Sequence, residues 1–340
     1  MKKVLIITHQ NDNYSIEKVT QYLKEKGAEV VRFNTDLYPS EVCVSQYISN
    51  GELKTLIRTN GASHELDAFE AIWYRRFYLG QALDNTIPAD YRKAILEESR
   101  RVMLGVMETS DVFKLDDYRN VRRTSDKHLQ LKLAQEIGLR IPNTLVTNDA
   151  TALEDFYKSY PQGIITKMQS SFAIYKDGVE NVVFTNRVEA VHLEDKESLQ
   201  ISPMKFQESI EKQLELRVTI VGDRLFTYAV DSQKMDGAKT DWRREGANFV
   251  DQWHPFQLPE KIETQLLQLM DQLSLNYGAA DLILTPENEY VFLEVNPVGE
   301  FFWLDKISGG EIASAIADLL VGKGKRRVVS IAFQNDYYVD

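Results

Sequence analysis

The stretch NYGAADLILTPENEYVFLEVNPVGEFFW, residues 276–303, decides the fold of the C-terminal part of the chain. Two apolar runs flank residues 286–289, whose sequence PENE predicts a four-residue turn between two antiparallel strands. If these four residues form the loop, Thr285 pairs with Tyr290. The pattern therefore predicts a β-hairpin with a defined register.

Counting back along this hairpin places three oxygen-bearing side chains on one patch of the sheet. Asp281 lies opposite Glu294, and Asn296, two residues further on, points to the same face. Two carboxylates about 5 Å apart at Cβ repel each other unless a cation lies between them. Hard oxygen ligands with room for phosphate oxygens are typical of Mg²⁺ held against a nucleotide. Salt bridges to lysines, or a shared proton, are the alternative interpretation.

Composition excludes several classes of protein. The 340 residues include 40 Lys and Arg against 51 Asp and Glu, a formal net charge of −11, which argues against a general nucleic-acid binder. A single cysteine, Cys43, excludes a disulfide within the chain and a multi-cysteine zinc site. The N-terminus lacks the apolar run of a secretory signal, and no stretch approaches the roughly 20 apolar residues of a membrane span. We expect a cytoplasmic protein with no nucleic-acid or membrane partner.

The N-terminal part reads as a βαβ unit. Residues 4–7 are apolar throughout, which is typical of a strand buried on both faces of a parallel sheet. A helix from about Ser15 ends at Gly27, and residues 29–33 form the next strand. The first turn contains no glycine, so the dinucleotide-binding fingerprint is absent. Pro88 opens a long helix with a predicted inner face of Tyr91, Ile95, Val102 and Val106.

Changes in pattern along the chain suggest three units and a tail. A second unit begins with a helix that we expect Ser125 to cap, followed by strands of a small antiparallel sheet. A third unit, from about residue 200, is richer in strands. The predicted domains are 1–120 (N-terminal α/β), 121–203 (central), 204–325 (C-terminal, with the candidate metal hairpin) and 326–340 (tail).

Two lysines lie where they could meet an anion. Lys127 is in the first turn of its helix, at the electropositive end. Lys167 lies in an otherwise apolar strand, where it must find an anion or extend to solvent. For either lysine alone, a solvated surface position is the more common outcome.

Further polar residues follow in the third unit. Strand-end backbone at 208–210 could offer one acceptor and one donor to an adenine edge, and Glu215 could accept from a ribose hydroxyl. Arg217 shares the face of Glu215 and supplies a planar fork for phosphate or carboxylate, and Arg243 and Arg244 follow in a loop. An Arg–Glu ladder across a sheet is the alternative.

In this order and spacing the set resembles the ATP-grasp superfamily of carboxylate ligases. The segments AIWYRRF, KHLQLKLAQEIGLRIPNTL, FQESIEKQLELRVTIVG and LEVNPVGEFFW are similar to those of microviridin-type ATP-grasp ligases, also called graspetide synthetases. The resemblance implies an α/β (α+β) chain with the ATP-grasp fold: an N-terminal βαβ pre-ATP-grasp domain, a small central domain and a C-terminal mixed-sheet domain.

The resemblance also implies roles for individual residues. The nucleotide would be bound by Lys127, Lys167, Glu208, Ile210, Glu215, Ser170 and Ser171. The magnesium ligands would be Asp281, Glu294 and Asn296. The residues that hold the γ-phosphate and the activated acyl group would be Arg217, Arg243 and Lys167. A leader peptide would dock on strands around 165–185 and a helix at about 187–197, whose acidic residues include Glu189, Glu194 and Asp195; an ordinary solvated acidic helix is the alternative.

The activity that the resemblance implies is ATP-dependent macrocyclisation of a precursor peptide. With ATP and Mg²⁺, such an enzyme would close ω-ester links between Asp or Glu carboxylates and Thr or Ser hydroxyls of the core peptide, through an acyl phosphate. The alternatives are an ω-amide-forming or small-molecule carboxylate ligase and, further away, a non-catalytic nucleotide-dependent peptide-binding protein. The implied partner is a leader-bearing precursor with a core rich in Thr or Ser and in Asp or Glu, and the family favours a homodimer.

Overall fold

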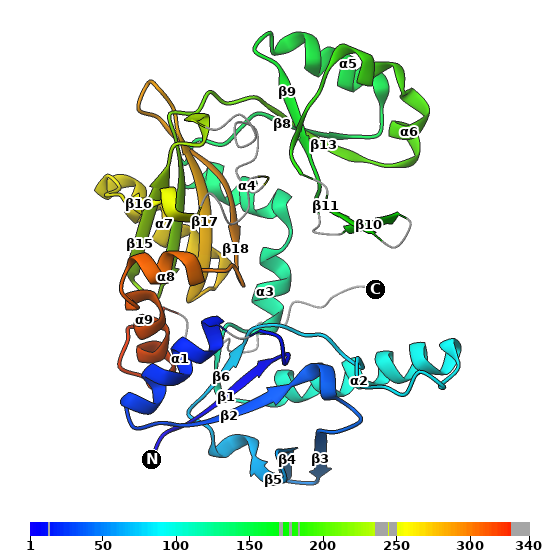
Figure 1. The fold of residues 1–340 in the computed structure, drawn as a ribbon, viewed down its shortest axis with the longest axis vertical. Coiled ribbons are helices and arrows are strands. Elements are labelled where there is room, and N and C mark those ends of the chain that lie inside the picture. The colour runs from blue at the N-terminus through cyan, green and yellow to red at the C-terminus, as the bar shows by residue number, and fades with distance from the viewer. Residues whose placement is uncertain are drawn as a thin grey trace.

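The structure is a computed structural model that describes residues 1–12, 14–169, 173–176, 179–182, 184–234, 244 and 250–327. For 173–176 and 179–182 only the backbone is described. The N-terminal domain lies at the base in Figure 1, with the other two sheets above it.

A four-stranded parallel sheet forms the N-terminal domain, as the apolar run at 4–7 predicts. Its order is β2-β1-β6-β7, with every pair parallel. The strands are β1 (Lys3–Thr8), β2 (Glu29–Asn34), β6 (Ala71–Tyr74) and β7 (Phe113–Leu115). The helices of this part are α1 (Tyr14–Glu25), α2 (Ala89–Thr109) and α3 (Tyr118–Thr124), with 3₁₀ turns η1 (Thr35–Leu37) and η2 (Leu66–Ala68).

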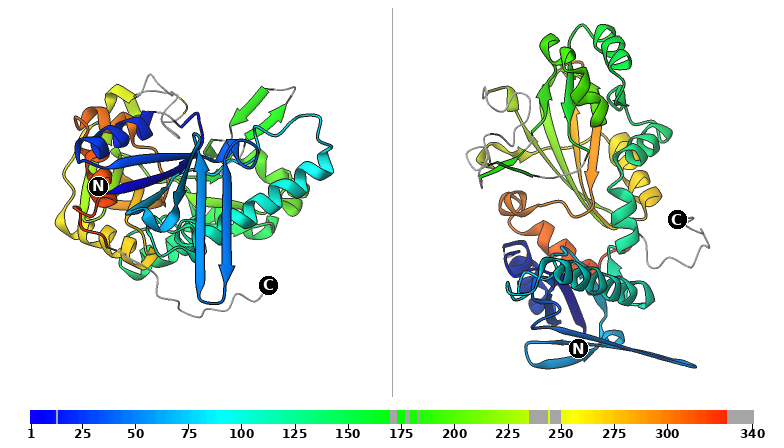
Figure 2. Two further views of the ribbon diagram at one scale, coloured as in Figure 1. Left: turned by 90° about the horizontal axis from the view of Figure 1, so that it is seen from below. Right: turned by 90° about the vertical axis from the view of Figure 1, so that its right-hand side faces the viewer.

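A second, antiparallel sheet of three strands projects from this domain. Its strands are β3 (Cys43–Ser49), β4 (Glu52–Thr59) and β5 (Ala62–Glu65). Ser49 pairs with Glu52 across the Asn-Gly turn, and the long β3–β4 hairpin is prominent in Figure 2. Of the inner face predicted for α2, only Val106 is buried, whereas Tyr91 and Val102 are exposed. The prediction was wrong because the first half of α2 extends away from the sheet (Figure 1).

The central part is a second four-stranded sheet, β12-β9-β13-β8, in which every pair is antiparallel. Its strands are β8 (Thr144–Thr147), β9 (Ile164–Lys167), β12 (Asn186–Arg187) and β13 (Met204–Glu208). The associated helices are α5 (Ala150–Ser159), the 3₁₀ turn η3 (Ala190–Glu194) and α6 (Lys196–Ile201), and β10 (Ala173–Lys176) and β11 (Val179–Val182) form a separate hairpin. Helix α4 (Lys127–Glu136) precedes β8 in the chain but packs on the C-terminal part, where Leu131 and Ala134 share a buried cluster with Leu282 and Val295.

Two local predictions in this part need correction. The side chain that caps α4 is Asp126 rather than Ser125, because the Asp126 carboxylate accepts from the backbone N–H groups of His128 and Leu129. The helix expected at about 187–197 is instead a 3₁₀ turn followed by the short α6, since Asp195 starts a new helix by accepting from the Ser198 N–H.

The C-terminal part is the five-stranded sheet β16-β15-β14-β17-β18. Its strands are β14 (Leu214–Val221), β15 (Arg224–Val230), β16 (His254–Pro255), β17 (Tyr277–Leu284) and β18 (Tyr290–Asn296), accompanied by η4 (Ser232–Lys234), α7 (Glu260–Leu273), α8 (Phe302–Ile307) and α9 (Glu311–Leu320). Its strand pairs are antiparallel, and an isolated parallel bridge joins Arg140 to Val291, so the sheet is of mixed type.

The predicted hairpin forms, but its register differs near the turn. Leu284, rather than Thr285, pairs with Tyr290. A bulge between Asp281 and Leu282 then adds one residue on β18, so that Asp281 still lies opposite Glu294. The predicted pairing of the two carboxylates is confirmed because the shift at the turn and the bulge cancel.

The last helix returns to the N-terminal domain. Apolar residues of α9, including Ile316, share one buried cluster with Val4 and Ile6 of β1 and Val19 of α1. The central sheet has its own small core, in which Phe206 packs with Ile164 and Leu153. Within the described residues, no helix has both the length and the apolar character that crossing a membrane requires.

Candidate active site

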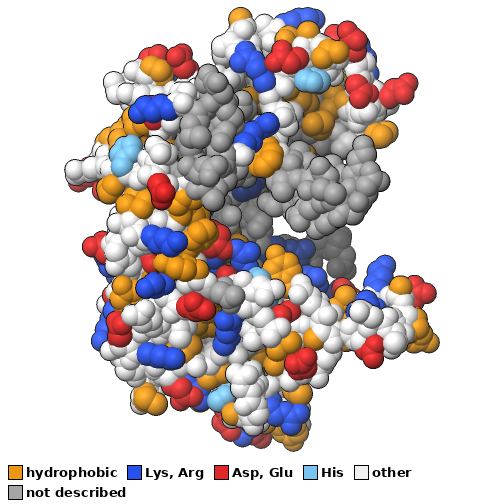
Figure 3. Space-filling model, in the orientation of Figure 1, with side chains coloured by type: hydrophobic (Ala, Val, Ile, Leu, Met, Phe, Trp, Pro, Cys, Tyr) orange, Lys and Arg blue, Asp and Glu red, His pale blue; other side chains and the backbone are white. Residues whose placement is uncertain are grey.

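A cavity of about 860 Å³ lies between the central and C-terminal sheets. We call the cavity-facing side of β9 and β13 the central wall, and that of β14, β17 and β18 the C-terminal wall. The predicted residues that line the cavity are Lys167, Glu208, Ile210, Glu215, Arg217, Asp281, Glu294 and Asn296. Figure 3 shows a notch on this face of the molecule, between the central part above and the N-terminal domain below. Tertiary structure thus gathers residues that are far apart in sequence.

The C-terminal wall carries two ion pairs. Arg217 and Asp281 are directly opposite on β14 and β17, and Nη1 donates to both carboxylate oxygens at 2.8 and 2.9 Å. Arg217 is 8% exposed, and its Nη2 also donates to the Glu300 carbonyl at 3.2 Å. On the neighbouring strand, Glu294 accepts from Lys127 at 3.0 Å. The alternative interpretation of the hairpin, salt bridges to basic residues, therefore describes the protein without a ligand.

The electrostatics of Glu294 show how cationic this site is. Burial alone raises the pKa of a carboxyl, but Lys167, Lys127 and the hydrogen bond from Lys127 outweigh it and hold the pKa of Glu294 well below its usual range. Glu294 is thus firmly ionised at neutral pH, which suits a metal ligand.

The donor set at this hairpin fits Mg²⁺. Asp281 and Glu294 are opposite one another, and Asn296, opposite Ala279, lies on the same face at the strand end. The Asn296 amide oxygen accepts from the Val298 N–H at 3.0 Å in this conformation. Among the described residues no group of three His, Cys, Asp or Glu side chains forms a metal cluster. A divalent ion here would therefore take two carboxylates and an amide, and would depend on phosphate oxygens for the rest of its shell.

The central wall carries two lysines. Lys167, at the end of β9, was predicted; Lys205, the second residue of β13, was missed although it lies directly opposite Lys167. Lys205 is 2% exposed. Burial, with the nearby charges of Lys167 and Lys127, lowers the pKa of Lys205 to about 7, while Glu294 acts in the opposite direction. In sequence, Lys205 reads as an ordinary polar position between Met204 and Phe206.

Residues 208–210, at the end of β13, form a segment that we call the hinge. The side chain of Glu208 holds it in place. The Glu208 carboxylate accepts from both the backbone N–H and the side-chain amide of Asn143, at 2.9 and 3.1 Å. The Glu208 side chain is thus used for structure, and the backbone N–H groups of Glu208 and Ser209 donate to the carbonyls of Asn143 and Gly163. Among the N–H groups at 208–210, that of Ile210 is therefore the candidate donor to adenine. Beyond it, Glu215 accepts from Lys212 at 3.0 Å and faces the cavity.

Three predicted residues, Ser170, Ser171 and Arg243, lie outside the described residues. Arg244, next to one of them, donates to the Thr185 carbonyl and the Asn186 side chain, both at 2.8 Å. Arg244 therefore binds the start of β12 instead of reaching into the cavity.

The predicted leader-binding residues are exposed and do not line the cavity. Glu189 makes a 3.9 Å ion pair with Arg187, and Asp195 caps α6. Glu194 lies on the surface at the end of η3.

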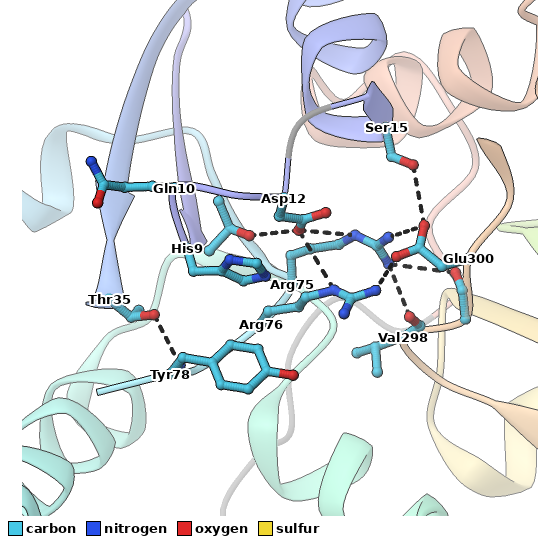
Figure 4. A network of polar contacts seen from close by, with 12 residues as sticks. His9, Gln10, Asp12, Ser15, Thr35, Arg75, Arg76, Tyr78, Val298 and Glu300 are labelled. Carbon is cyan, nitrogen blue, oxygen red and sulfur yellow. Dashed lines mark hydrogen bonds and ion pairs between the residues drawn. The ribbon is translucent and has the colours of Figure 1, made fainter. Parts of the chain in front are cut away.

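A polar network that sequence reasoning missed joins the N-terminal domain to the edge of the site (Figure 4). Arg75, at the end of β6 and 2% exposed, donates to the Val298 carbonyl at 2.9 Å and pairs with Glu300 at 2.7 Å. Arg76 also pairs with Glu300, and Asp12, from the loop after β1, lies 3.6 Å from Arg75. The only signal in sequence was the Arg-Arg pair directly after a buried strand. The network fixes the loop that follows Asn296.

Two sheets that enclose a cavity, with lysines on one wall and paired carboxylates on the other, define an ATP-grasp enzyme. Residues 3–122 match the family described as MvdD pre-ATP grasp domain. The predicted fold class is therefore confirmed.

The chain is similar to several known proteins. It is 42% identical to a Chryseobacterium gregarium RiPP-associated ATP-grasp ligase solved with ADP and a leader and core peptide, with a TM-score of 0.94 over 98% of this chain and 100% of that one. It is also 42% identical to the macrocyclase MdnC of Microcystis aeruginosa MRC, solved with the precursor peptide MdnA, with a TM-score of 0.85 over 94% of this chain and 99% of that one. The chain belongs to the RiPP-associated ATP-grasp ligases, enzymes linked to ribosomally made, modified peptides.

A more distant relative is a probable alpha-L-glutamate ligase of Histophilus somni. The two are 24% identical over 208 residues, which is 60% of this chain and 66% of that ligase. The chain thus spans slightly less than two thirds of that curated relative.

Proposed function

We propose that this protein is an ATP-dependent macrocyclase that closes ω-ester links in a ribosomally made precursor peptide. The observation that carries the proposal is the single cavity in which Asp281, Glu294 and Asn296 face Lys167 and the hinge at 208–210. A triphosphate needs this combination of cations, metal ligands and a hinge for its base. Two 42%-identical relatives support it: one was solved with ADP and a leader and core peptide, and the other with its precursor peptide.

The proposed reaction has two steps. A peptide Asp or Glu carboxylate oxygen attacks the γ-phosphorus of ATP and breaks its bond to the bridging oxygen, which gives an acyl phosphate and ADP. A Thr or Ser hydroxyl then attacks the acyl carbon, loses its proton and expels inorganic phosphate, which leaves an ester. Lys127 and Lys167 balance phosphate charge in the first step, and Arg217 is placed to orient the acyl group.

Mg²⁺ held by Asp281, Glu294 and Asn296 would supply charge neutralisation at the phosphates. In the unliganded protein the carboxylates already pair with Arg217 and Lys127. These cations therefore keep the ligand set in place, and they are themselves available to phosphate or carboxylate oxygens. No enzyme nucleophile is required by this chemistry.

The test is incubation of the protein with ATP, Mg²⁺ and candidate precursors rich in Thr or Ser and in Asp or Glu, followed by mass spectrometry. The expected product has lost one water per ring, with one ADP formed for each. Asp281→Asn serves as the matched inactive control. ADP release without mass loss would reject macrocyclisation, and no ADP release with any precursor would favour a non-catalytic peptide-binding protein.

The bond type is tested on the same product. An ester opens in mild alkali and regains its water, whereas an ω-amide survives, so a resistant product would shift the assignment to the amide-forming alternative. The similarity to an alpha-L-glutamate ligase keeps a ligase of small carboxylates as a second candidate. That activity would increase the mass of the acceptor instead of decreasing it.

We propose that the acidic residues around η3 contribute to leader binding, with Glu189, Glu194 and Asp195 offered to a basic leader residue. Glu194 gives the cleanest test, because Asp195 caps α6 and Glu189 pairs with Arg187. Glu194→Lys is expected to raise the KM for the full precursor about tenfold and to leave activity on a leaderless core unchanged. Equal KM values for wild type and variant would place the leader elsewhere.

We further propose that the protein is a cytoplasmic homodimer. The support for the dimer is a set of exposed apolar side chains on the β3–β4 hairpin, Tyr47, Ile48 and Leu53, which would be covered by a second copy. Light scattering after size exclusion should give twice the monomer mass, and Ile48→Glu should shift it toward monomer. A monomeric wild type would reject this part of the proposal.

A further inference from the structure

A buried lysine faces the cavity in a position that the nucleotide roles described above leave unused. Lys205 is the second residue of β13, an interior strand with β9 on one side and β8 on the other. Phe206, the next residue, points into the core of the central part, so Lys205 must point to the opposite face. The next pair on that face, Ile165 of β9 and Gln207 of β13, lines the cavity. Lys205 therefore belongs to the central wall.

The position is electrostatically unfavourable in the protein alone. Lys205 and Lys167 are directly opposite in an antiparallel pair, an arrangement in which like charges destabilise the sheet. Among the described residues, the Lys205 ammonium has no hydrogen bond or ion pair. The nearby carboxylate, Glu294, is already bonded to Lys127 at 3.0 Å. Three ammonium groups thus share one carboxylate.

A buried, unpaired ammonium is expensive, and folded proteins rarely contain one unless a partner arrives. The partner that fits must be anionic, must carry more than one charge and must enter the cavity between the two walls. A nucleotide polyphosphate meets all three conditions. A carboxylate alone carries one negative charge, whereas three ammonium groups less the one carboxylate of Glu294 leave an excess of two positive charges.

We propose that Lys205 is a third phosphate-binding lysine, which acts with Lys127 and Lys167 on the polyphosphate of a nucleoside di- or triphosphate. The inference rests on the proposed function and adds a binding residue to its site. Lys205 then has opposite effects on the unliganded and the nucleotide-bound protein. It lowers the stability of the first and contributes to the affinity that forms the second. A lysine with a purely structural role would not produce this opposition of signs.

The experiment compares Lys205→Met with wild type and with a matched control, Lys158→Met. Methionine keeps most of the length of the side chain and removes the charge. Lys158 is an exposed lysine on α5 of the same central part, with a side chain 71% exposed, so its loss changes net charge equally. Thermal unfolding is measured without ligand, and binding of ADP and of a non-hydrolysable ATP analogue is measured by calorimetry with Mg²⁺ present.

Lys205→Met is expected to raise the unfolding temperature of the unliganded protein and to weaken nucleotide binding about tenfold to a hundredfold, the range of a charge-assisted hydrogen bond. Adenosine, which has no phosphate, should bind wild type and Lys205→Met with equal affinity. Lys205→Arg keeps the charge, so it should retain part of the affinity without the gain in stability. Lys158→Met should change neither quantity.

Two results would overturn the inference without touching the proposed function: wild-type nucleotide affinity in Lys205→Met, or an equal loss of affinity for adenosine and ADP. If the wild-type protein itself binds neither ADP nor the ATP analogue, both the proposed function and the role of Lys205 fall together. The wild-type measurement therefore separates the two failures.

Discussion

On the C-terminal wall of the cavity, Arg217 is bonded to Asp281 and Lys127 to Glu294. On the central wall, Lys167 and Lys205 lie directly opposite each other on adjacent strands. The first arrangement is nearly neutral and holds its side chains in place before any ligand enters. The second concentrates like charge and is relieved only by an anion. The difference supports our proposals that the C-terminal wall holds a metal ion and that the central wall binds phosphate.

Removal of a carboxylate from the C-terminal wall should have the largest effect. Glu294→Gln leaves the charges of Lys127, Lys167 and Lys205 without their shared carboxylate and takes away a proposed metal ligand, so we expect ring formation to fall at least about 100-fold. Mass spectrometry of the precursor under single-turnover conditions measures the loss. Retention of more than about half of the activity would contradict the assignment of Glu294 as a ligand.

The same variant tests stability as well as activity. Breaking a buried pair by removing one partner typically costs about 3–5 kcal/mol, and the 28% exposure of the Glu294 side chain should reduce that figure. Chemical denaturation of Glu294→Gln without ligand should therefore show a clear loss. Glu194→Gln, a surface carboxylate in the central part, is the control and should unfold like wild type.

Loss of a lysine from the central wall should raise the stability of the unliganded protein. A double-mutant cycle of Lys167→Met and Lys205→Met can measure how the two lysines interact. Each single variant relieves the same repulsion, so the double variant should gain less stability than the sum of the two, by about 0.5–1 kcal/mol. Denaturant titration of the four unliganded proteins gives the coupling. Strict additivity would mean that the two ammonium groups do not interact.

Lys205 also predicts a pH dependence of the unliganded protein. The pKa of Lys205 is about 7 in the folded state against 10.5 for an ordinary lysine, so between these values the unfolded chain binds more protons. Stability must then rise as pH increases from about 7 toward 10, relative to Lys205→Met. The difference between the two denaturation profiles checks this, and a flat difference would show that Lys205 keeps an ordinary pKa.

Prediction from sequence was strongest where one local pattern fixed the answer. The alternation around PENE predicted the β17–β18 hairpin, and the apolar run at 4–7 predicted a central parallel strand. Prediction was weaker where a single residue changes the geometry. The bulge beside Asp281 has no sequence signature, and the capping of α4 by Asp126 rather than Ser125 depends on which side chain reaches the free N–H groups.

The sequence by itself determined most of the strands and helices, the β17–β18 hairpin and the chemical character of most cavity residues, because these follow from periodicity and from residue type over short spans. Only the tertiary structure decided that Lys205 faces Lys167 and that Arg75 reaches across to Glu300. Both contacts join segments that are distant in the chain, and strand order and register, rather than local pattern, set which side chains meet. The same physics explains why the charge that a nucleotide must relieve became visible only in the folded protein.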